Sequence, residues 1–138
     1  MVVRVVLAVA ILAVAGAIAW WLDHRRVVAP PSQGRAVVPQ QLDRNDFPRP
    51  DVPWLVVLFT SRHCDSCAGL VDKAMPLVSD DVGVVEIEYT AAPELHKRYQ
   101  IDAAPITVLV DAAGVTRGSF VGAFGAPELW SALAELRA

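Results

Sequence analysis

The sequence predicts an α/β domain with a mixed four-stranded sheet and helices on both faces, preceded by one apolar helix that can span a membrane. Between residues 54 and 136, β-branched and apolar runs alternate with segments of helical spacing. A helical segment separates the first two runs, as a right-handed crossover between parallel strands requires. A tight turn separates the last two, which is typical of an antiparallel hairpin. Residues 5–22 carry no charge.

The chain of 138 residues suits one domain with an accessory segment. Its net charge of −3 is unevenly distributed, because residues 1–50 hold six Arg against three Asp, whereas residues 51–138 hold six Lys and Arg against twelve acidic residues. An acidic body without a basic cluster argues against nucleic-acid binding. The only two cysteines lie three positions apart, so the chain lacks the disulfide framework of small secreted proteins.

We predict a transmembrane anchor over residues 1–23. The 18 uncharged residues 5–22 would form a helix of about 27 Å, enough to cross a bilayer. Trp20 and Trp21 end this run, where aromatic rings favour the membrane interface. The alternative is a cleaved signal peptide, since Ala-Ile-Ala at residues 17–19 resembles a cleavage site. The length of the run, the two Trp and the basic pair that follows favour the anchor.

The charges that flank the anchor favour a cytoplasmic domain on a single-pass protein of the cell membrane. The positive-inside rule compares Arg4 and the amino terminus with Arg25, Arg26 and Arg35, and the downstream side holds more charge. The extracytoplasmic side is the alternative, because single-pass proteins with short amino-terminal segments often insert in that orientation.

Residues 24–50 are predicted to form a linker, and residues 51–138 the globular domain. Six of the ten prolines fall within residues 23–53, a composition typical of an extended tether. Within this tether, residues 37–38 are candidates for an edge strand and residues 42–47 for a short helical turn.

Four strands and three helices are predicted within the domain. The strands are β-branched and aromatic runs at residues 56–60, 82–89, 106–110 and 116–121. The first helix covers residues 64–75, where Leu70, Val71, Ala74 and Met75 form one apolar stripe. The others cover residues 93–99, opened by a proline, and residues 127–136. This order predicts a mixed sheet covered on both faces.

Cys64 and Cys67 are predicted to stand where the first strand meets the first turn of the following helix. The unpaired N–H groups and the positive dipole end of a helix N-terminus favour a thiolate on Cys64. Cys67 would lie one turn deeper on the same face, within disulfide reach. The pair therefore suits a two-step exchange, in which Cys64 attacks a substrate disulfide and Cys67 resolves the mixed disulfide. A protonated His63 would lower the Cys64 pKa further; alternatively, His63 occupies an exposed loop.

Zinc binding and incidental thiols are the other interpretations of the cysteine pair. A zinc site needs four ligands. The remaining candidates are His63, which is constrained by its adjacency to Cys64, and His96, which is distant and expected to be solvated. No metal site is therefore predicted.

With the CxxC after a strand and Ala-Pro-Ile-Thr at residues 104–107 opening the third strand, the chain resembles the thioredoxin superfamily. The resemblance covers about residues 54–136. YQIDAAPIT at residues 99–107 is similar to the family's segment around its cis-proline, and Val-Gly-Ala at residues 121–123 to its glycine turn before the last helix. The resemblance implies a thioredoxin-like three-layer sandwich, in which Pro105 is cis, lies against the sulfurs and lines the groove for an extended substrate segment.

Five positions depart from the family pattern. The Trp that usually precedes the first cysteine is His63, and Asp65-Ser66 replaces the usual Gly-Pro. The buried Asp that serves the family as proton acceptor is Leu58, and Glu86 stands where thioredoxins carry a Lys. We hypothesise that Glu86 points toward Cys67 as a general base. The alternative is that strand alternation turns Glu86 toward water.

Together these features predict a membrane-tethered thiol–disulfide oxidoreductase that acts on protein thiols and disulfides, with reduction as the favoured direction. Residues 5–22 would supply the membrane contact. No cofactor is expected beyond the redox-active Cys64–Cys67 pair. The alternative is a thioredoxin-fold binding module that docks a partner, or holds an ion such as Cu(I) through the thiolates, without turnover.

Overall fold

The computed structural model describes residues 1–24 and 36–138, which fall into two separate compact units. The first unit contains one helix, α1 (Val2–His24). Its segment Val2–Trp21 is long and apolar enough to cross a membrane. The predicted apolar helix is therefore confirmed, whereas Arg25, Arg26 and Arg35, on which the orientation depends, lie outside the described residues.

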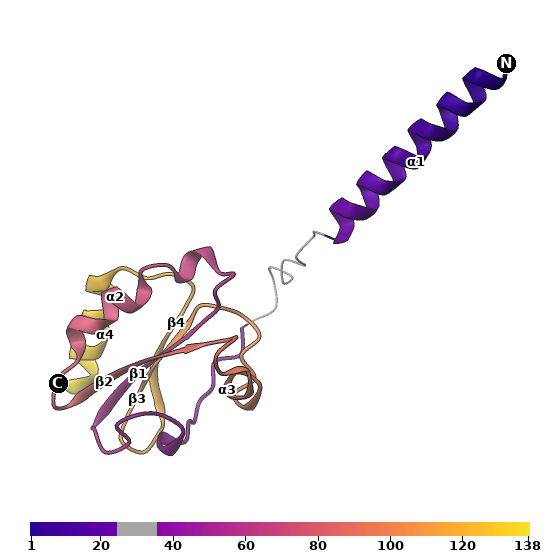
Figure 1. Cartoon of the computed structure of the whole chain (residues 1–138). Coiled ribbons are helices and arrows are strands. Elements are labelled where there is room, and N and C mark those ends of the chain that lie inside the picture. The colour runs from indigo at the N-terminus through magenta and orange to yellow at the C-terminus, as the bar shows by residue number, and fades with distance from the viewer. Residues whose placement is uncertain (25–35) are drawn as a thin grey trace. The chain divides into compact units, whose positions relative to one another are not determined.

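The second unit is built on a four-stranded sheet in the order β2-β1-β3-β4 (Figure 1). The central strand β1 (Trp54–Thr60) pairs in parallel with β2 (Val82–Glu88). On its other side it pairs antiparallel with β3 (Ile106–Val110), which pairs antiparallel with β4 (Thr116–Val121). The predicted mixed sheet is confirmed.

Helices cover both faces of this sheet. Two of them, α2 (Leu70–Ala74) and α4 (Ala126–Arg137), lie on one side, and α3 (Pro93–Arg98) lies on the other (Figure 1). β1 is buried on both faces because its side chains alternate between the two cores. Val56 and Leu58 face α2 and α4, whereas Val57 and Phe59 belong to the core on the α3 side. Each such fully buried side chain contributes about 1.5–3 kcal/mol.

The predicted helix over residues 64–75 is wrong, because it is broken into pieces. Asp65–Cys67 form a single 3₁₀ turn, and α2 begins only at Leu70. Gly69 causes the break, since its φ of 74° lies in the left-handed region that a residue without a Cβ enters at little cost. Another 3₁₀ turn, Met75–Leu77, follows α2.

Residues 36–50, which the sequence assigns to the linker, lie within the second compact unit. Leu42 is 1% exposed and joins the core on the α3 side together with Phe47. The hydroxyl of Tyr99 fastens this segment, because it accepts a hydrogen bond from the Asp43 N–H and donates one to the Asp46 carboxylate. This proline-containing segment is thus anchored by buried apolar side chains.

The local structure of this segment matches the sequence prediction only in part. The expected helical turn is present as a 3₁₀ turn at Arg44–Asp46. Residues 37–38 form no strand. The segment instead forms an isolated β-bridge between Gln41 and Val115, and the Thr116 N–H and hydroxyl donate to the Gln40 and Pro39 carbonyls. The Leu42 N–H donates to the Gly114 carbonyl, and a Cβ at Gly114 would overlap the Leu42 carbonyl. This close approach explains why residue 114 is a glycine.

Candidate active site

Cys64 and Cys67 form a disulfide at the end of β1, with their Cα atoms 5.4 Å apart. Both cysteines are half-buried. They line a shallow pocket of about 280 Å³, and Thr60, Glu86 and Glu88 line it from the strands. The disulfide is therefore accessible from solvent beside a group of polar side chains.

The disulfide is held by a short turn and not by the predicted long helix. Cys64 is the N-cap residue of the 3₁₀ turn, its N–H donates to the Ser61 carbonyl at 3.0 Å, and its carbonyl accepts from the Cys67 N–H at 3.2 Å. The helix macrodipole is a sum over aligned peptides, and this turn has three residues while α2 has five. The predicted activation of Cys64 by a continuous helix is therefore not supported.

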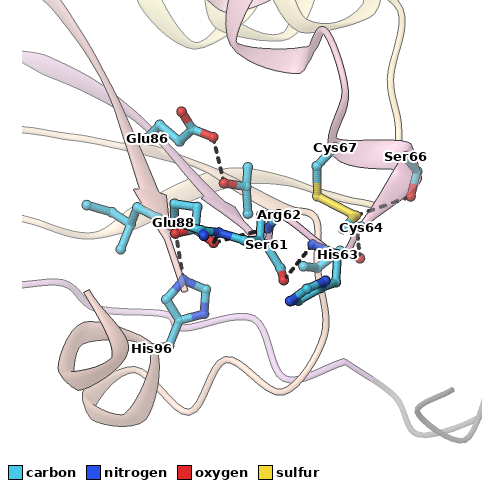
Figure 2. The surroundings of a disulfide bond; sticks show 12 residues. Ser61, Arg62, His63, Cys64, Ser66, Cys67, Glu86, Glu88 and His96 are labelled. Atoms are coloured by element: carbon cyan, nitrogen blue, oxygen red, sulfur yellow. Dashed lines mark hydrogen bonds and ion pairs between the residues drawn. A yellow bond between two sulfur atoms is a disulfide. The ribbon is translucent and has the colours of Figure 1, made fainter. Parts of the chain in front are cut away.

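Two oxygen atoms lie 3.5 Å from the Cys64 sulfur. One is the Ser66 hydroxyl, shown in Figure 2, and the other is the Ala104 carbonyl. A disulfide sulfur carries no hydrogen, so the Ser66 hydroxyl is the donor in the oxidised protein. The same hydroxyl can donate to a Cys64 thiolate after reduction.

The segment that opens β3 lies directly beside this sulfur. The Ala104–Pro105 peptide bond is cis, as the family resemblance implied. The Gly122 N–H at the end of β4 donates to the Pro105 carbonyl at 2.9 Å, and the φ of 93° at Gly122 suits a glycine. Pro105 therefore adjoins the disulfide where β1 ends and β3 begins.

Glu86 lines the disulfide pocket although it is exposed. Its Oε1 accepts a hydrogen bond of 2.7 Å from the hydroxyl of Thr60, which is 2% exposed (Figure 2). Glu86 is thus exposed at the edge strand β2, as strand alternation predicts, and it also lines the pocket. Its role as a general base for Cys67 stays a prediction.

Glu88 fastens the loop that leads into Cys64, a role that the sequence analysis missed. Its carboxylate accepts hydrogen bonds from the N–H groups of Arg62, Thr90 and Ala91 and from the Thr90 hydroxyl. These bonds, above all the one from the Thr90 hydroxyl, lower the pKa of Glu88 to about 2. The signal available in the sequence was a Glu near the end of a predicted strand, followed two residues later by a Thr.

The two histidines considered from the sequence have different surroundings. His63 is exposed, and its ring is turned away from the disulfide in Figure 2. His96 is 3% exposed, its Nε2 donates to the Ile87 carbonyl at 2.8 Å, and it packs edge-on against Phe59. The expectation that His96 is solvated is wrong, because α3 turns it into the core. Within residues 1–24 and 36–138, no group of three or more His, Cys, Asp or Glu could hold a metal ion.

No protein-family model and no curated protein matches this sequence. Among solved structures, the germline-specific thioredoxin Deadhead from Drosophila melanogaster is 24% identical, with a TM-score of 0.54 over 63% of this chain and 84% of that one. Mitochondrial thioredoxin 3 from Saccharomyces cerevisiae is 23% identical, with a TM-score of 0.52 over 62% of this chain and 80% of that one. A mutant thioredoxin from Halobacterium salinarum is 21% identical, with a TM-score of 0.54 over 62% of this chain and 75% of that one.

These similarities agree with the strand order, the cis-proline and the disulfide. The domain therefore has a thioredoxin-like fold. Leu58, which replaces the family's buried Asp, is 0% exposed and belongs to the core beneath α2. The fold is thus retained without a carboxylate at that position.

We predict that the contribution of Glu88 to stability depends on pH. A carboxylate with a lowered pKa stabilises the fold fully above its ordinary value of 4.5, and this contribution is lost as the pH falls toward about 2. Glu88→Gln should therefore be less stable than the wild type at neutral pH, and the difference should shrink as the pH falls through this window. Urea unfolding at a series of pH values measures it, with exposed Glu94→Gln as the control. A difference of constant size would contradict this role.

Proposed function

We propose that the protein is a membrane-tethered thiol–disulfide oxidoreductase that exchanges disulfides with protein substrates. The observation that supports this most directly is the half-buried Cys64–Cys67 disulfide, whose Cys64 sulfur lies 3.5 Å from the carbonyl preceding cis-Pro105. Structural disulfides are usually buried and resistant to exchange. A half-buried disulfide in a pocket at the ends of β1 and β2 is instead open to attack by an incoming thiolate.

The exchange needs only the two cysteines and the substrate. In the reducing direction, the Cys64 thiolate attacks one sulfur of a substrate disulfide, so that a mixed disulfide forms and the first substrate thiolate leaves. Cys67 then loses its proton, which the departing substrate thiolate finally takes up, and attacks the Cys64 sulfur. The mixed disulfide breaks, the Cys64–Cys67 disulfide forms, and the substrate leaves with both sulfurs reduced. Two electrons pass from the cysteine pair to the substrate.

Cys64 is the proposed nucleophile because its sulfur has a donor. The Ser66 hydroxyl at 3.5 Å can stabilise the Cys64 thiolate through a hydrogen bond. The adjacent cis-Pro105 segment would line the groove that receives the substrate chain. The His63 side chain is exposed and its ring is turned away from the sulfurs (Figure 2).

We expect the full-length protein to catalyse the reduction of insulin by dithiothreitol, which is followed as turbidity when the insulin B chain precipitates. Cys64→Ser should abolish the acceleration, because no thiolate remains to begin the exchange. Cys67→Ser should accumulate a mixed disulfide with insulin, detectable on a non-reducing gel. Equal rates for the wild type and Cys64→Ser would rule out the proposed reaction and leave a binding role.

Tethering to the membrane through α1 is the second part of the proposal. It is supported by the apolar segment Val2–Trp21. We expect the protein to remain in the membrane pellet after alkaline carbonate extraction and to be released when residues 1–24 are deleted. Recovery of the full chain in the supernatant would contradict a spanning anchor. From the flanking charges, the proposed side for the domain is the cytoplasm, and a carboxy-terminal reporter fusion tests it.

A further inference from the structure

The proposed exchange requires that Cys67 lose a proton, and the structure lacks the usual acceptor for it. Leu58 occupies the position of the family's buried Asp and is 0% exposed. The carboxylates that line the disulfide pocket are those of Glu86 and Glu88, and Arg62 is the pocket's other charged residue. These two carboxylates are therefore the candidate bases that line the pocket from the strand side.

The sheet register places Glu86 on the side of the sheet that carries the cysteines. Glu86 of β2 is paired with Leu58 of β1, whose side chain packs in the same core as Leu70 of α2. Thr60, two residues further along β1, projects to the same side and reaches the edge of the pocket. Its buried hydroxyl donates to Glu86 Oε1 at 2.7 Å and so holds the carboxylate at the pocket.

Glu86 and Glu88 differ in how their oxygens are used. Both Glu88 oxygens accept hydrogen bonds from backbone N–H groups, and Arg62 Nε lies 4.0 Å from one of them. The pKa of about 2 that results makes Glu88 a weak base. Glu86 accepts one hydrogen bond within the described part of the chain, the one from Thr60, and its Oε2 remains available. Asp65 and His63 lie on the exposed turn and are absent from the pocket lining.

We propose that Glu86, positioned by Thr60, accepts the Cys67 proton during the resolving step, relayed by one water molecule in the pocket. A pocket of about 280 Å³ has room for this water, since one molecule occupies about 30 Å³. The Cys67 S–H bond breaks and an O–H bond forms on Glu86. The Cys67 thiolate then displaces the substrate sulfur from Cys64, and the departing thiolate takes up the proton. This inference rests on the proposed exchange reaction.

The resolving step can be observed by itself with an aromatic disulfide. Reduced full-length protein in detergent is mixed with one equivalent of 5,5′-dithiobis(2-nitrobenzoate) in a stopped-flow instrument. Attack by Cys64 releases the first thionitrobenzoate, and attack by Cys67 on the mixed disulfide releases the second. Glu86→Gln should slow the second release by about 10²-fold at neutral pH, a typical loss for a general base, and leave the first unchanged. The slowed rate should recover as the pH rises, because hydroxide replaces the missing base.

Two further variants and the direction of the effect make the outcome decisive. Thr60→Val, which removes the donor but keeps the side-chain shape, should slow the second release to a smaller extent. Glu94→Gln on α3 should behave as the wild type. A carboxylate that acted only by repulsion would raise the Cys67 pKa, so its removal would speed the second release. An unchanged or faster second release in Glu86→Gln therefore overturns the inference, whereas a wild type without any second release overturns the exchange reaction itself.

Discussion

The antiparallel pairing of β1 with β3 is the constraint on which the candidate active site depends. Phe59 near the end of β1 pairs with Ile106 at the start of β3, so the residues that follow one and precede the other must adjoin. These are the cysteine turn, residues 64–67, and the segment around cis-Pro105. The Cys64 sulfur and the Ala104 carbonyl therefore lie 3.5 Å apart. Both strands are almost fully buried, so the geometry of the site is set by the hydrophobic core.

Local hydrogen bonds, and not a long helix, hold the cysteine turn in position beside the paired strands β1 and β3. The Glu88 carboxylate accepts a hydrogen bond from the Arg62 N–H in the loop that leads into Cys64, and the Gly122 N–H donates to the Pro105 carbonyl. Ser66 supplies a hydroxyl to the sulfur. A hydrogen bond to an anion stabilises it at short range, whereas a helix macrodipole requires a run of aligned peptides. The reactivity of Cys64 therefore depends on its immediate neighbours.

Much of the fold could be predicted from the sequence, because strand composition, spacing and turn residues are local signals. The break at Gly69 could not, since a glycine within an apolar helical spacing is compatible with a continuous helix, and the spacing does not reveal its left-handed φ of 74°. The burial of Leu42 and His96 also escaped prediction, because neither proline content nor residue type reveals tertiary contacts. In the site, the cysteines and Pro105 were identifiable by motif, whereas the backbone hydrogen bonds of Glu88 depend on a loop conformation.

The central claim is that the Cys64–Cys67 bond is a reversible redox centre and not a structural crosslink. Equilibrating the full-length protein with glutathione buffers of graded potential, followed by alkylation and mass spectrometry, tests it most directly. We predict a single two-electron transition above about −300 mV, the limit below which structural disulfides usually fall. A pair that stays oxidised at every ratio of reduced to oxidised glutathione would contradict the account.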